Sequence, residues 1–192
     1  MTEPDLPKRL AWVGQHLLDI IAPGWENDPH MVDTPVRWAS WWEEVITEDP
    51  FVPTSFPTET TVDQMVAVTG IETWSLCAHH LLPFSVNVSI GYIADRNLLG
   101  LSKFARITQA RARQPTTQEQ LASTIADDIS EATGSQHVAV TASGVHLCMA
   151  MRGVRTPAVM TTSITRGAFR DEPSARAEWF SILARAVPPP HS

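Results

Sequence analysis

Dense clusters of positive charge are missing from this 192-residue sequence, which carries 14 Lys and Arg residues against 21 Asp and Glu residues and a formal net charge of −7. Because no segment concentrates Lys and Arg densely enough to bind a phosphate backbone, we expect no nucleic-acid partner. Runs of about 18 apolar residues are also missing, and the first residues lack the basic and apolar regions of a secretory signal. We therefore expect no membrane partner and a cytoplasmic location.

Cysteine is scarce, since Cys77 and Cys148 are the only two residues of this type. In a reducing compartment, two cysteines so far apart more often bind metal, take part in chemistry or simply pack than form a disulfide. Apolar residues make up 43% of the chain. This content excludes disorder as the main state, and the length fits one domain or one domain with a small appendage.

The first third of the chain reads as helical. An apolar stripe with spacings of three and four predicts a helix that ends near Pro23-Gly24. A second helix is predicted from Thr34 as its N-cap and Pro35 at the first helical position. The residues expected on the buried sides are Leu6, Leu10, Val13, Leu17 and Ile21 in the first helix, and Trp38, Trp41, Trp42, Val45 and Ile46 in the second.

Three prolines, Pro50, Pro53 and Pro57, argue against regular structure across 49–58. We therefore divide the chain into an N-terminal helical region with linker, 1–58, and a main domain, 59–192. The pattern in the main domain predicts an α+β fold, with an antiparallel sheet covered by helices on one face. The expected strands are 62–68, 71–76, 86–92, 137–143, 145–151 and 158–163, and the expected helices are 102–113, a helix following Thr116 that stops at Gly134, and 173–186 with Trp179, Phe180 and Leu183 inward.

A Cys-x-x-His spacing occurs at Cys77-Ala78-His79-His80. It allows a thiolate and an imidazole to bind one ion from a tight turn. On its own this motif is outweighed by a structural interpretation, in which Cys77 is a small buried apolar residue and the histidines lie at the surface.

A second motif runs from His146 to Arg152. In an extended strand, His146, Cys148 and Arg152 would share one face. Cys77, His80 and Cys148 would then supply three ligands to zinc and leave a fourth position for water, as in catalytic sites. The competing interpretation is an ordinary core cysteine beside an exposed histidine, and it requires two coincidences.

Two further motifs have both functional and structural interpretations. With Ser102 as the N-cap, Lys103 and Arg106 would lie at the positive end of a helix, where phosphate binds well. A solvated basic helix face explains the same residues equally well. With Thr116 as the N-cap, Glu119 is the N3 carboxylate of a capping box. The spacing alone favours this structural role.

These motifs, in this order and spacing, resemble those of the GTP cyclohydrolase I family, from about residue 28 to the C-terminal helix. The matching segments are Asp33-Thr34-Pro35-x-Arg37, Cys77-Ala78-His79-His80-Leu81-Leu82-Pro83-Phe84, Gly100-Leu101-Ser102-Lys103 with Arg106, Gln118-Glu119, His146-x-Cys148-x-x-x-Arg152-Gly153, and Thr161-Thr162-Ser163.

The resemblance implies a tunnelling fold whose sheets join into rings, with two rings stacked as a homodecamer and active sites between subunits. It implies Zn²⁺ as cofactor and GTP as substrate, opened at C8 to release formate and form 7,8-dihydroneopterin triphosphate. The roles that it implies are zinc ligation by Cys77, His80 and Cys148; proton transfer by His79 and His146; a place near the ribose for Ser102; guanine binding by Gln118 and Glu119; and triphosphate binding by Lys103, Arg106, Arg152 and Arg37.

The sequence departs from the family pattern at four places. Ala78 stands where Glu is usual, Ser40 where Lys is common, Gln120 where Arg is usual, and Ser85-Val86-Asn87 where an aromatic, Gly and Lys are general. Fewer cations weaken triphosphate binding. Two alternatives therefore stay open: a divergent enzyme that opens the imidazole ring of another purine derivative without forming a pterin, and an inactive binding subunit with a regulatory role.

Overall fold

The computed structural model describes residues 5–47, 52–57, 64–95 and 97–186. The chain divides into two compact units, 1–48 and 49–192. None of the helices in the described residues is both long and apolar enough to cross a membrane.

The N-terminal unit contains α1 (Leu6–Ile21), a 3₁₀ turn η1 (Trp25–Asn27) and α2 (Thr34–Ile46). The predicted extent of the first helix is confirmed, but its predicted buried stripe is only partly right: Leu6 and Leu10 are half-buried, whereas Val13, Leu17 and Ile21 are 44%, 43% and 64% exposed. The buried residues are Gly14 and Leu18 in α1 and Pro35 and Ala39 in α2. A side chain at Gly14 would lie 3.1 Å from Trp38 and 3.3 Å from Pro35, so the close approach of the helices selects the face that is buried.

Two further expectations for α2 are wrong. Thr34 is the first helical residue rather than the N-cap, which is Asp33, and neither forms a side-chain cap. Trp41 is 38% exposed. Its ring packs edge-on against that of Trp42, with the ring centroids 4.9 Å apart. Trp41 therefore contacts a neighbouring aromatic ring of α2 although it is exposed to solvent.

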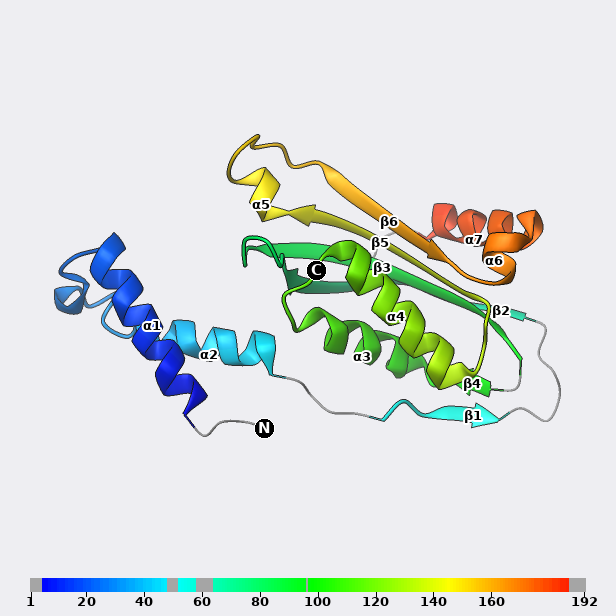
Figure 1. Cartoon of the computed structure of the whole chain (residues 1–192), viewed down its shortest axis with the longest axis horizontal. Coiled ribbons are helices and arrows are strands. Elements are labelled where there is room, and N and C mark those ends of the chain that lie inside the picture. The colour runs from blue at the N-terminus through cyan, green and yellow to red at the C-terminus, as the bar shows by residue number, and fades with distance from the viewer. Residues whose placement is uncertain (1–4, 48–51, 58–63, 96, 187–192) are drawn as a thin grey trace. The chain divides into compact units, whose positions relative to one another are not determined.

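The second unit is built on a four-stranded antiparallel sheet (Figure 1). Its order is β2 (Gln64–Leu76), β3 (Pro83–Ala94), β5 (Val138–His146) and β6 (Val159–Thr165). The two strands predicted over 62–76 form the single strand β2 within the described residues, with a register shift between Val68 and Ile71, where Gly70 has a φ of +80°. Residues 62 and 63 lie outside the described residues. A left-handed glycine thus lets one strand continue through an irregularity.

A short two-stranded sheet joins β1 (Ser55–Pro57) to β4 (Asn97–Leu99). The expectation that 49–58 lacks regular structure is therefore wrong at 55–57. Pro57 is the last residue of its strand, a position where the missing N–H is tolerated.

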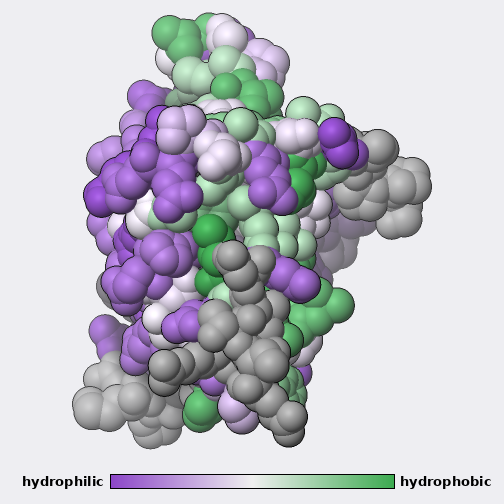
Figure 2. Space-filling view, turned by 90° about the vertical axis from the view of Figure 1, so that its right-hand side faces the viewer, coloured by the Kyte–Doolittle hydropathy of each residue, from purple (hydrophilic) through white to green (hydrophobic). Residues whose placement is uncertain are grey.

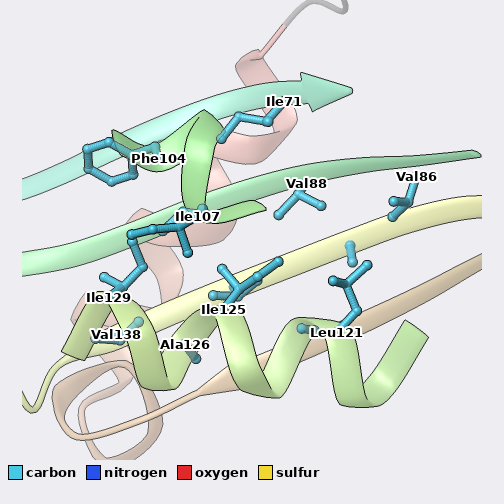
Figure 3. Packing of buried hydrophobic residues seen from close by; sticks show 14 of the residues in the cluster. Ile71, Val86, Val88, Phe104, Ile107, Leu121, Ile125, Ala126, Ile129 and Val138 are labelled. Atoms are coloured by element: carbon cyan, nitrogen blue, oxygen red, sulfur yellow. The ribbon is translucent and has the colours of Figure 1, made fainter. Parts of the chain in front are cut away.

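Helices α3 (Leu101–Ala112) and α4 (Gln118–Thr133) cover one face of the larger sheet and enclose the main core (Figures 1 and 3). The strands contribute Ile71, Val86 and Val88, and the helices contribute Ile107 and Ile125, all of them buried. Because α4 presents apolar residues at spacings of three and four, its whole inner face is excluded from water.

The opposite face of the sheet is also covered at one end, by α6 (Ala168–Asp171) and α7 (Pro173–Arg185) (Figure 1). Trp179 and Phe169 are fully buried there, with Trp179 directly over Gly91. The expectation of helices on one face only is thus wrong at this end. Phe180, predicted to point inward, is 44% exposed because Trp179 occupies the inner position. Figure 2 shows hydrophilic residues gathered on the left of the face seen there, with hydrophobic and hydrophilic residues mixed in its middle.

Three local predictions near the motifs need correction. Ser102 lies inside the first turn of α3, whose N-cap is Gly100, and forms no cap. The N-cap of α4 is Thr117, which accepts a 3.2 Å hydrogen bond from the Gln120 N–H, so Glu119 is not the capping residue. The strand predicted over 145–151 ends at His146 and is followed by the helical turn α5 (Leu147–Ala150).

Candidate metal centre and active site

The turn between β2 and β3 positions the first two candidate ligands. The Cys77 carbonyl accepts hydrogen bonds from the His80 and Leu81 N–H groups at 3.2 and 2.8 Å, and the Cys77 N–H donates to the Leu82 carbonyl at 2.9 Å. Leu81 adopts a φ of +54°, which lets the chain reverse within this short segment. The turn leaves the Cys77 Sγ and the His80 Nδ1 3.7 Å apart.

The same turn is bonded to the segment that leads into α4. The Thr116 N–H donates to the Leu76 carbonyl at 2.9 Å, and the Ala78 N–H donates to the Thr116 carbonyl at 3.0 Å. These two bonds tie the candidate ligands to the N-terminus of α4, where Gln118 and Glu119 are located.

Cys148 completes the group from α5, 71 residues further along the chain. Its Sγ lies 3.9 Å from the Cys77 Sγ. The ligand atoms of Cys77, His80 and Cys148 all lie within 4.8 Å of one another, so the structure brings the three predicted ligands together. The alternation argument that placed Cys148 is nevertheless wrong, because a helical turn rather than a strand carries it there.

These separations suit a tetrahedral ion. Sulfur ligands about 2.3 Å from a tetrahedral zinc ion lie about 3.8 Å from each other, close to the separation of the two cysteines here. Burial raises the pKa of the Cys148 thiol, and the neighbouring Cys77 raises it further, while Arg152 acts in the opposite direction. A cation bound between the two sulfurs would therefore displace a proton.

Two further histidines flank this group. His79 is exposed, with its Nδ1 3.9 Å from the Cys77 Sγ. His146 is half-buried and stacks on the fully buried ring of Phe84, with centroids 4.4 Å apart and the planes 4° from parallel. Burial lowers the pKa of His146, and the Glu119 carboxylate offsets part of that effect. His79 thus contacts a candidate ligand, and His146 directly precedes α5, which carries Cys148.

Gln118 makes buried hydrogen bonds that the sequence did not predict. Its side chain is 1% exposed, and its Oε1 lies 3.1 Å from His146 Nε2. Its Nε2 donates to the Ala142 and Met160 carbonyls and to the Thr162 hydroxyl at 2.9, 3.1 and 3.2 Å. The sequence holds a signal for this burial, because 118 shares the helical spacing of the buried residues 121, 122 and 125.

The remaining predicted site residues occupy separate elements. In α3, Ser102 and Arg106 are exposed and Lys103 is half-buried; Arg152 and Glu119 are exposed after α5 and at the start of α4. Arg37 belongs to α2 of the N-terminal unit, where it donates to the His30 carbonyl at 2.9 Å and lies 3.6 Å from Asp33.

This α+β chain thus brings two cysteines and a histidine into a group that could hold a metal ion, as in hydrolases that use a metal-bound water. The sequence profile of the GTP cyclohydrolase I family matches residues 15–184. The chain belongs to this family, whose members are hydrolases acting on cyclic amidine bonds, and the resemblance seen in the motifs is confirmed.

The chain is also similar to curated members of that family. It is 40% identical over 171 residues to GTP cyclohydrolase 1 of Corynebacterium glutamicum strain R, covering 85% of this chain and 87% of that protein. It is 37% identical over 186 residues to GTP cyclohydrolase 1 1 of Pseudomonas syringae pv. tomato, covering 90% and 96%.

Among solved structures, the archaeosine synthase QueF-Like in its apo form matches 52% of this chain and 91% of that one, with a TM-score of 0.41 and 17% identity. A likeness at this level supports no further argument.

Proposed function

We propose that this protein is a zinc-dependent cyclohydrolase that opens the imidazole ring of GTP at C8, releases formate and forms 7,8-dihydroneopterin triphosphate. The observation that carries the proposal is the grouping of Cys77, His80 and Cys148 within 4.8 Å in a chain of this family.

Zinc fits this donor set better than a hard cation does. Two thiolates and one imidazole are soft and borderline ligands, whereas Mg²⁺ and Ca²⁺ prefer oxygen. Three protein ligands leave a fourth position for water, and zinc bound in such a site makes a nucleophilic water available near neutral pH.

The chain's own histidines would handle the protons. Water addition at C8 requires a proton at N7 of the imidazole ring, and the later loss of formate requires further proton transfers. Imidazole side chains suit this task because their pKa lies near the working pH. The candidates are His79, whose Nδ1 lies 3.9 Å from the Cys77 Sγ, and His146, which directly precedes the helical turn that carries Cys148.

Glu119 is the candidate for recognition of the base. A carboxylate accepts hydrogen bonds from the guanine N1–H and 2-amino groups together, an arrangement that adenine lacks. With the N-cap role taken by Thr117, the exposed Glu119 carboxylate has no capping duty. Replacing Glu119 by Ala would lower kcat/KM for GTP about 10- to 150-fold, as loss of charged hydrogen bonds implies. The adjacent exposed Gln120→Ala is the matched control.

The triphosphate would be bound by cations from several elements. Lys103 lies in the first turn of α3, where backbone N–H groups favour an anion, and Arg106 follows one turn later. Arg152 and Arg37 are the other proposed phosphate contacts, and Ser102 would lie near the ribose. Ser40, which stands in place of the usual lysine, has an uncharged hydroxyl, and it donates to the Val36 carbonyl of its own helix at 3.1 Å.

We also propose a homo-oligomeric ring, with a decamer as the expected assembly. The outer edges of β2 and β6 end the four-stranded sheet of the described residues. Unpaired strand edges favour pairing with another chain, which supports ring closure through these strands. Size-exclusion chromatography with light scattering tests the assembly, and a monomer would contradict it. The cytoplasmic location stays a prediction.

The activity is tested by incubating zinc-loaded protein with GTP and measuring fluorescent pterin after oxidation, together with formate. Pterin and formate in equal amounts are expected. Formate or a ring-opened nucleotide without pterin would replace this proposal with the divergent enzyme that Ala78 and Ser40 suggest. Neither product, with no stoichiometric zinc, would point to the inactive binding subunit.

A further inference from the structure

We propose that Gln118 is a positioning residue that fixes the orientation of the His146 ring and holds a proton on its Nε2. This inference rests on the proposed function, in which His146 transfers protons. It assigns Gln118 a task carried out through His146 rather than by contact with the base.

The orientation of the Gln118 amide follows from its surroundings. One side of the amide faces the Ala142 and Met160 backbone carbonyls at 2.9 and 3.1 Å. Carbonyl oxygens only accept hydrogen bonds, so the atom facing them must be the NH₂ group. The Thr162 hydroxyl, 3.2 Å away, adds a third partner on the same side. The amide oxygen is therefore the atom that faces His146.

This orientation determines which nitrogen of His146 carries the proton. The Gln118 Oε1 lies 3.1 Å from His146 Nε2 and can only accept, so Nε2 must donate. In a neutral imidazole the other nitrogen then has no proton. The Nδ1 lone pair is thereby left as the atom that takes up a proton and later gives it back, while Nε2 keeps its own throughout.

The ring plane is held independently of this hydrogen bond. His146 lies opposite Phe84 in the β3–β5 ladder and stacks on its ring at 4.4 Å. Phe84 is fully buried, so it offers a fixed platform. The stacking on Phe84 fixes the plane of the imidazole ring. The bond from Nε2 to Gln118 opposes a 180° rotation of the ring, which would exchange its two edges.

Gly144 provides the space in which the amide lies. A Cβ at this position would be 2.8 Å from Gln118 Oε1 and 2.5 Å from the Ser85 carbonyl oxygen. The φ of Gly144 is not in the left-handed region, so backbone conformation does not require glycine here. The requirement is space, both for the Ser85 carbonyl of the neighbouring strand and for the Gln118 amide oxygen that reaches His146.

The burial of Gln118 argues against a direct contact with the substrate. Its side chain is 1% exposed, and both its donor and its acceptor are already bonded. To contact a base, the amide would have to leave acceptors in the protein interior without partners. The neighbouring Glu119 is exposed and has no such commitment.

The tautomer can be observed directly, without any assay of activity. Solid-state ¹⁵N NMR of the sedimented, zinc-loaded protein with labelled histidine distinguishes protonated from unprotonated ring nitrogens, and a His146→Ala sample assigns the signals. We expect wild-type His146 to carry a proton on Nε2. A proton on Nδ1 alone would overturn the proposal, whether or not the protein acts on GTP.

A variant then tests the cause. Gln118→Met keeps the side-chain length and removes the acceptor, so His146 should populate both tautomers. With GTP, kcat should fall between about 10- and 100-fold, within the range of general acid–base effects, while KM stays within about threefold. The control is Ser143→Ala, since Ser143 bonds the Thr161 hydroxyl at 3.0 Å and no hydrogen bond joins it to Gln118. A raised KM with unchanged kcat, or an unchanged tautomer in Gln118→Met, would refute the positioning role.

Discussion

Replacing His80 and His79 separately provides the sharpest test of the metal centre. The two histidines are adjacent, both are exposed, and their Nδ1 atoms lie 3.7 and 3.9 Å from the Cys77 Sγ. Within the described part of the chain, only His80 belongs to the group whose ligand atoms lie within 4.8 Å of one another. We therefore expect His80→Ala to lose the metal and His79→Ala to retain it.

The size of the loss follows from the coordination. Zinc binds four-ligand structural sites with about 10–16 kcal/mol, or about 2.5–4 kcal/mol for each ligand on average. Removing His80 should thus weaken zinc binding about 100- to 1,000-fold. Replacement of His79, which contacts the Cys77 sulfur but is not a proposed ligand, should cost about tenfold, the lower end of the effect of groups that support a ligand.

Competition with a chromophoric chelator at neutral pH measures both affinities, and elemental analysis of the purified proteins gives the zinc content. Circular dichroism of each variant checks that the sheet and helices are retained. Equal loss of zinc in His79→Ala and His80→Ala would refute the assignment of His80 as the sole histidine ligand. Full zinc content in His80→Ala would refute the ligand group itself.

Three further outcomes are expected. Because burial raises the pKa of the Cys148 thiol, protons compete with the metal, so chelator competition should show weaker zinc binding at about pH 6.5 than at about pH 8.5, and equal affinity would contradict this. Gly91→Ala would place a Cβ 2.7 Å from Trp179, and urea unfolding should show a loss of about 1–3 kcal/mol, reduced when Trp179→Phe is added. Ile125→Ala, in the fully buried core, should cost about 2–5 kcal/mol, against less than about 0.5 kcal/mol for the exposed Glu131→Ala on the same helix.

The sequence predicted the elements better than the faces that they bury. Apolar spacing located α1 and α4, because local periodicity is a property of the segment itself. It did not reveal that Gly14 would bring α2 close enough to bury a different face of α1, since that depends on the partner helix. Trp179 and Phe180 show the same limitation. The sequence does not tell which of these adjacent aromatic residues packs against the sheet, because that depends on the orientation of α7 on the sheet.

The site was predicted by residue type and only partly by geometry. Cys77, His80 and Cys148 meet as expected, yet the alternation argument fails at Leu147, where the strand gives way to a helical turn. Four residues are too few for periodicity to distinguish a strand from a turn. The N-cap of α4 was predicted one residue too early, at Thr116 instead of Thr117, because two consecutive threonines offer the same hydroxyl group.

The separation of Cys77 and Cys148 along the chain has a mechanical consequence. The two sulfurs belong to residues 71 positions apart, so an ion that they share would connect the turn of the β2–β3 hairpin to α5, which follows β5. Removal of the ion by a chelator would then free the β2–β3 turn and α5 together. The hydrogen bonds of the sheet and the apolar core beneath it would stay intact. Amide exchange should accordingly quicken around 77–82 and 147–152 well before the sheet itself opens.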